Sequence, residues 1–178
     1  WSSGPNTPWT YGAHKCALHQ STVVCAGGYI MNRFQAGAYS MDLSATDLKW
    51  TTLPSLSDSR TSHGIASVNG YVYVIQGYCA HYCFSDTVET LDVSNPTSWR
   101  TTKTPDARYE PTATAANGKL YVISGKTSSV SRLHSYISTD ATNPLSSWET
   151  VEVDIGTDGD ANSNADRKWA YYSVTTGV

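Results

Sequence analysis

The chain has 178 residues, of which 15% are charged, and its formal net charge is −3. This length is enough for one domain with a buried core. The low charge provides no concentrated positive surface that would bind nucleic acid or an anionic membrane. No apolar run approaches the roughly 20 residues of a membrane helix. We therefore expect no nucleic-acid partner and no membrane span.

Tryptophan recurs along the chain at a constant interval of 49 residues: Trp1, Trp50, Trp99 and Trp148. An aspartate precedes each of the last three by seven or eight residues: Asp42, Asp92 and Asp140. Internal periods near 40–50 residues are typical of propeller blades. The spacing therefore predicts repeated units at approximately 5–54, 55–105 and 106–154, with the start of a further unit at 155–178.

Each unit is predicted to contain four short strands. The first two strands are joined by Asn69-Gly70 in one unit and by Asn117-Gly118 in the next, and Asn-Gly favours the type I′ turn of a tight hairpin. The second strand, 71–75, is apolar or aromatic at every position, so both of its faces should be covered. A blade stacked between two neighbours provides that burial, whereas a β-sandwich is the alternative architecture.

Together these repeats resemble the kelch family over nearly the whole chain. The matching features are the Asn-Gly hairpin, the Asp followed by Trp, an arginine opening each unit and a strand ending in glycine. The arginines and glycines concerned are Arg60, Arg108, Arg167, Gly27, Gly28, Gly77 and Gly125. The resemblance implies an all-β fold of kelch-type β-propeller blades, each with four antiparallel strands, and about three and a half blades are present.

A propeller needs at least about four blades to close. We therefore expect the remaining blades to come from a longer chain, giving a ring of six or seven blades. The alternative is that a second copy of the chain closes the ring as a dimer.

The four cysteines are predicted to form two disulfides, which favours an oxidising, extracellular (secreted) location. A hairpin turn at Gln20-Ser21 places Cys16 directly opposite Cys25, in a non-hydrogen-bonded pair that lies within disulfide reach and at a core position. Two buried thiols are the alternative.

Cys79 and Cys83 are expected in a loop between the second and third strands, where a disulfide would act as a small clip. A zinc site with His81 is the alternative, but structural zinc usually takes four ligands. His14 and His63 occupy equivalent repeat positions, which favours a structural role for both.

The loops between the second and third strands should emerge on one face, together with the connections between blades. They carry the chain's two phenylalanines, and the resemblance implies that this face binds partners. The predicted binding residues are Arg33, Phe34, Tyr78, His81, Tyr82 and Phe84. Aromatic and arginine side chains are enriched in binding sites, so we expect a protein or glycan ligand; aromatics that only pack their own loops are the alternative.

Secreted kelch propellers also include enzymes, such as copper radical oxidases similar to galactose oxidase, and sialidase-like propellers are glycan-active. The segment SATDLKW at 44–50 only faintly matches an Asp-box, and no catalytic motif is evident. The sequence therefore predicts a binding or structural module without a catalytic set in this segment, with a propeller domain of a secreted enzyme as the alternative.

The segment 157–166 carries oxygen side chains at alternate positions, an arrangement typical of calcium loops. It predicts a Ca²⁺ site held by Asp158, Asp160, Asn162 and Asp166. Ser163 stands where such loops usually have glycine, so the expected affinity is modest. A solvated polar loop without metal is the alternative.

Overall fold

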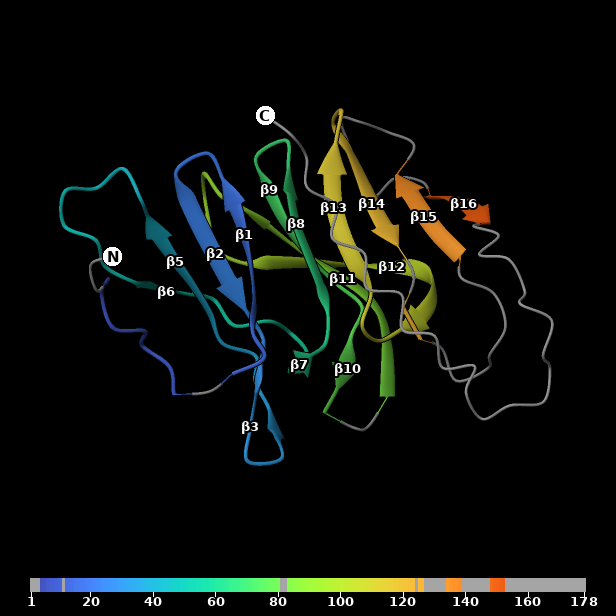
Figure 1. Cartoon of the computed structure of the whole chain (residues 1–178), viewed down its shortest axis with the longest axis horizontal. Coiled ribbons are helices and arrows are strands. Elements are labelled where there is room, and N and C mark those ends of the chain that lie inside the picture. Colours follow the sequence, from blue (N-terminus) through green and yellow to red (C-terminus); the bar gives the residue numbers. More distant parts are fainter. Residues whose placement is uncertain are drawn as a thin grey trace.

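The computed structural model describes residues 4–10, 12–80, 83–123, 125–126, 134–138 and 148–152. These residues form antiparallel sheets that stand side by side (Figure 1). The first sheet has the order β1-β2-β5-β6, with bounds β1 (Lys15–His19), β2 (Thr22–Ala26), β5 (Ala38–Asp42) and β6 (Thr51–Leu53).

The second sheet is built on four strands that repeat this order: β8 (Gly64–Val68), β9 (Tyr71–Ile75), β11 (Cys83–Asp92) and β12 (Trp99–Arg108). Two short strands, β7 (Arg60–Thr61) and β10 (Tyr78–Cys79), extend it at one end, because β10 pairs with both β7 and β11. The third sheet contains β13 (Thr112–Ala116), β14 (Lys119–Ile123), β15 (His134–Ser138) and β16 (Trp148–Glu152).

A separate hairpin of β3 (Tyr29–Ile30) and β4 (Arg33–Phe34) prolongs the connection between β2 and β5. It projects from one end of the sheets, which we call the loop end (Figure 1). The β1–β2, β8–β9 and β13–β14 turns lie at the opposite end, the turn end.

The turn-end hairpins have the backbone conformation that the Asn-Gly pairs predict. Asn69 and Gly70 have φ angles of 52° and 84°, and Asn117 and Gly118 have φ angles of 50° and 71°. Positive φ at both central residues defines the type I′ turn, which matches the twist of the flanking strands. The predicted hairpins are confirmed.

Two apolar cores lie between successive sheets, and β9 contributes to both. Val72 and Val74 belong to the core shared with the first sheet, whereas Tyr73 and Ile75 belong to the core shared with the third. Side chains alternate between the two faces of a strand, so β9 is covered on both sides as predicted. The repeated tryptophan also crosses a junction, because Trp99 Nε1 donates to the carbonyl of Pro54 at 2.7 Å.

The arginine that opens the second unit is part of the structural core. Arg60 is fully buried and forms an ion pair with Glu89 at 2.8 Å. Its guanidinium also donates to Thr87 Oγ1 at 2.6 Å and to the carbonyl of Gln76 at 3.0 Å. Its own carbonyl accepts the Gly28 amide at 2.8 Å, which joins the first sheet to the second.

The described strands confirm the predicted all-β class. The number of blades, the completion of a ring by a longer chain or by a second copy, and the kelch resemblance itself stay predictions. The expected start of a further unit at 155–178, including Arg167, lies outside the described residues. Within the described residues, no helix is long and apolar enough to cross a membrane.

Candidate functional site

Both predicted disulfides are present. Cys16 and Cys25 face each other in the β1–β2 register, with their Cα atoms 4.1 Å apart. The expected core position holds for Cys25, which is buried, but Cys16 is exposed. Cys79 and Cys83, whose Cα atoms are 5.3 Å apart, form the second bond and close the β10–β11 connection.

The second disulfide removes the thiolates that a zinc site would need, because both sulfurs are bonded to each other. His81 and Tyr82 lie outside the described residues. In the described part of the chain, no group of three or more His, Cys, Asp or Glu side chains could hold a metal ion. The predicted calcium ligands Asp158, Asp160, Asn162 and Asp166 also lie outside it, so the calcium loop stays a prediction.

Five aromatic side chains form a continuous row across the loop end, which we call the aromatic row: Tyr29, Phe34, Tyr78, Phe84 and Tyr109. Successive ring centroids lie 5.2 Å apart from Tyr29 to Phe34 and 5.5 Å apart from Phe34 to Tyr78. Phe84 stacks on Tyr109 at 4.7 Å, and Tyr78 lies 5.9 Å from each of these two rings. Offset and edge-to-face contacts at these distances are favourable.

The same backbone feature recurs at the end of each second strand and helps to place these rings. Each second strand ends in a glycine with positive φ (Gly77 at 106°), and the next residue enters the loop end. At Gly77 a Cβ atom would lie 2.7 Å from the Thr61 carbonyl oxygen, so the close approach of two backbones requires glycine. The residue that follows, Tyr78, pairs with both Thr61 and Phe84, which fixes its backbone between two strands of the second sheet.

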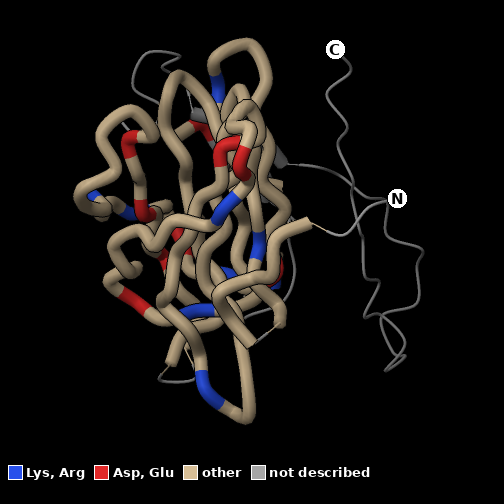
Figure 2. Tube along the Cα trace, turned by 90° about the vertical axis from the view of Figure 1, so that its left-hand side faces the viewer, with Lys and Arg blue, Asp and Glu red and all other residues tan. Residues whose placement is uncertain are grey.

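The row has an apolar tip at one end and a charged pair at the other. Met31, at the turn of the β3–β4 hairpin, is 87% exposed, and Arg33 beside it is also exposed. At the far end, the Lys126 ammonium lies 5.2 Å from the Tyr109 ring centroid and 3.4 Å from Glu110. Along the described trace, basic and acidic residues are interspersed (Figure 2). The five rings themselves are half-buried, so the row is partly accessible and partly self-packed.

The structure brings together Phe34, Tyr78 and Phe84 from the predicted binding residues and places Arg33 beside them. Sequence reasoning missed Tyr29, Met31, Tyr109 and Lys126. The repeat register contained a signal for two of these, because Tyr29, Tyr78 and Lys126 each follow the strand-ending glycine of their unit. Tyr109 had no such signal, since its counterpart after Arg60 is Thr61.

The two equivalent histidines lie inside the structure. His63 is fully buried, and burial lowers the pKa of His63 to about 3, with the nearby positive charges of Arg60 and Lys15 acting in the same direction. His14 packs against Trp9 with ring centroids 4.9 Å apart. These surroundings agree with the structural role that the sequence predicts for both side chains.

No family model matches the chain, and no curated protein matches it. Among solved structures, the chain is similar to one described as "Structure of YjhT", with 24% sequence identity and a TM-score of 0.59. The match covers 68% of this chain and 36% of that one. At this identity the likeness shows the fold alone, and the chain is an all-β protein with a propeller-like fold. The chain corresponds to only part of the length of that structure.

Proposed function

We propose that the chain is an extracellular binding module of the kelch type that engages a protein partner through the aromatic row. The observation that carries this proposal is the continuity of the row, in which rings from the β3–β4 hairpin, from the second sheet and from the connection after β12 meet at the loop end. A surface assembled from separate loops on a rigid scaffold is where binding residues usually lie.

The composition of the loop end favours a protein over a glycan. Aromatic residues, methionine and arginine are enriched in protein interfaces, and all three kinds are present in Tyr78, Met31 and Arg33. Methionine adapts its shape to irregular apolar partners, and Met31 is 87% exposed at a hairpin tip. A sugar would instead call for polar side chains arranged around its hydroxyl groups.

The two disulfides support an extracellular setting, because such bonds persist in oxidising compartments. The Cys79–Cys83 bond lies between Tyr78 and Phe84, so it also constrains two members of the row. A loop held in its bound conformation loses less entropy when a partner docks. In this proposal the remaining blades come from a longer chain or a second copy, and the row is one sector of a larger binding face.

A random peptide library displayed on phage tests the proposal, with the disulfide-intact chain as bait. We expect enriched peptides that carry apolar or aromatic residues. Met31→Ser and Phe34→Ala should each weaken a selected peptide by about 2 kcal/mol, roughly thirtyfold in Kd, as for interface hot spots. Met31 is solvent-exposed, so its substitution should leave thermal unfolding unchanged.

Leu18→Ser is the matched control. Leu18 is 58% exposed and lies on β1, outside the row, so this variant should bind the peptide as the parent chain does. Failure to enrich any peptide, or equal binding by Met31→Ser and Phe34→Ala, would reject the protein-binding proposal. Binding on a glycan array that both variants abolish, without peptide binding, would show a glycan-binding face instead.

A further inference from the structure

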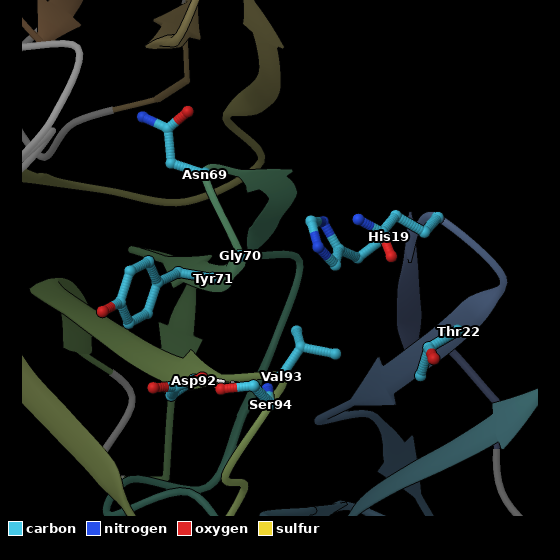
Figure 3. A pocket seen from close by; sticks show the side chains of 9 residues that line it. His19, Thr22, Asn69, Gly70, Tyr71, Asp92, Val93 and Ser94 are labelled. Atoms are coloured by element: carbon cyan, nitrogen blue, oxygen red, sulfur yellow. Dashed lines mark hydrogen bonds between the residues drawn. The ribbon is translucent and has the colours of Figure 1, made fainter.

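A pocket lies at the turn end, between the first two sheets and away from the aromatic row. It has a volume of roughly 420 Å³ and opens to solvent between three connections: the β1–β2 turn, the β8–β9 turn and the β11–β12 loop. Its lining residues are His19, Gln20, Thr22, Asn69, Gly70, Tyr71, Asp92, Val93 and Ser94 (Figure 3). We call this the turn pocket, and its size falls within the range of small-molecule sites.

The polar groups of the turn pocket are held in place by hydrogen bonds. His19 Nδ1 lies 3.0 Å from Ser67 Oγ, a contact that links the first sheet to the second. The imidazole points into the space between the two turns (Figure 3). Asp92 Oδ1 accepts from the Ser94 amide at 2.9 Å and from the Ser94 hydroxyl at 2.6 Å. Asp92 Oδ2 has no such partner among the described residues, so it is left to accept from a ligand.

Asp92 is held in its ionised form by hydrogen bonds within the protein. The hydrogen bonds from Ser94 lower the pKa of Asp92, and the nearby positive charge of Arg100 lowers it further. The Arg100 guanidinium also lies over the Tyr71 ring, 5.4 Å from its centroid. Because this cation already occupies the Tyr71 ring, and because no group of three metal-binding side chains is found among the described residues, the turn pocket favours a neutral ligand over an amine or a metal ion.

The remaining groups suit a ligand with many hydroxyls. Within the described structure, the side-chain amide of Gln20 and the hydroxyl of Thr22 have no hydrogen-bond partner, and both groups can donate and accept. Val93 and Tyr71 add carbon surface on the second-sheet side (Figure 3). A pyranose ring has hydroxyls around its edge and C–H groups on its faces, so it matches this mixture of hydroxyl, amide, carboxylate and apolar groups.

The turn pocket is not a by-product of the repeat. In the repeat register, the second junction has Val68 at the position of His19 and Lys119 at the position of Tyr71. The imidazole and the phenol are therefore specific to the first junction. We propose that the turn pocket binds one or two rings of a neutral sugar, independently of the aromatic row.

The test is a titration of the ¹⁵N-labelled chain with neutral sugars, followed by amide chemical shifts. The probes are D-glucose, D-galactose, D-mannose and N-acetyl-D-glucosamine at millimolar concentrations, with spermidine as a cationic comparison. We expect at least one sugar to shift amides of 19–22, 69–71 and 92–94, with a Kd in the millimolar range, whereas spermidine leaves them unchanged.

The variant Asp92→Asn should weaken the sugar at least tenfold, because it exchanges a charged acceptor for a neutral one. Asp42→Asn is the matched control: Asp42 accepts from the amide and hydroxyl of Ser44 as Asp92 does from Ser94, but it does not line the pocket. Thr22→Val should weaken the sugar with no effect on folding. Three results would overturn the proposal: no shift in the pocket with any of the sugars, unchanged affinity in Asp92→Asn, or pocket shifts with spermidine alone.

Discussion

The two ends of the sheets are built from the same strands but differ in chemistry. The loop end presents an aromatic row that runs from Tyr29 in the β3–β4 hairpin, over the second sheet, to Tyr109 in the connection after β12. The turn end presents a polar pocket confined to the junction of two sheets, around His19 and Asp92. We propose two classes of ligand for these ends, a protein for the first and a neutral sugar for the second.

The difference follows from how each end is constrained. Turn-end hairpins need positive φ in two consecutive residues, which favours Asn-Gly and leaves only the flanking residues free to vary. At the loop end, positive φ also occurs in two consecutive residues, Gln76 at 55° and Gly77 at 106°, but the loop that follows varies in length and closure. The first sheet has a projecting hairpin there, whereas the second has a disulfide clip. The end whose loops vary in length carries the aromatic row.

The largest expected effect comes from breaking the buried ion pair beneath the loop end. Glu89→Gln should lower the free energy of unfolding by about 3–5 kcal/mol, because it leaves the buried Arg60 charge with only the more distant and exposed Asp58 carboxylate, at 3.8 Å. Arg60 belongs to β7, which pairs with β10 and so positions Tyr78; peptide affinity should fall as well. Chemical denaturation measures the first effect and peptide titration the second.

The exposed pair of Lys103 and Asp86, at 2.8 Å, is the matched control for that variant. Lys103→Met should change stability by no more than about 1 kcal/mol, since exposed ion pairs contribute little. Equal losses of unfolding free energy in Glu89→Gln and Lys103→Met would mean that the buried ion pair does not support the junction.

Removal of the Cys79–Cys83 disulfide should affect binding at the loop end but not at the turn end. The double variant Cys79→Ser/Cys83→Ser should lose about 2 kcal/mol of stability by the loop-entropy relation. It should also weaken peptide binding and leave sugar binding unchanged. Cys16→Ala/Cys25→Val removes the other disulfide and reproduces the residues at 113 and 122 of the third unit. It should reduce stability without changing peptide affinity. If neither double variant changes the peptide affinity, the Cys79–Cys83 disulfide does not organise the row.

The smallest effect near neutral pH concerns His63 at the first junction. Its folded pKa of about 3 lies below its ordinary value of 6.5, so the unfolded chain binds more protons between these values. Stability is therefore fully present above pH 6.5 and falls as the pH decreases towards 3, by about 1.4 kcal/mol for each pH unit. His63→Asn should flatten this part of the stability–pH profile. An unchanged slope would contradict the buried, neutral state of His63.

Sequence periodicity predicted the local features of this fold well. The Asn-Gly hairpins, the doubly covered strand β9 and the pairing of Cys16 with Cys25 all follow from rules that act over a few residues. Side-chain contacts between residues far apart in the sequence were not predicted. The partner of Arg60 is Glu89, which is 29 residues away, and only the pairing of β7, β10 and β11 in one sheet brings them together.

The candidate sites divide in the same way. Phe34, Tyr78 and Phe84 were found because their loops occupy equivalent repeat positions. Tyr109 joins them from a connection between sheets, where the second unit has Thr61 at the equivalent position. The turn pocket was missed altogether, because it arises where three separate connections converge and nothing in the sequence marks that convergence.

The proposal that the loop end is the protein-binding end is tested most directly by mapping a selected peptide on the ¹⁵N-labelled chain. We predict amide shifts at 29–34, 78–84, 109–110 and 126 when the peptide is added, with 19–22, 69–71 and 92–94 unchanged. Shifts confined to the turn end, or peptide binding that leaves the residues of the aromatic row unperturbed, would contradict the account.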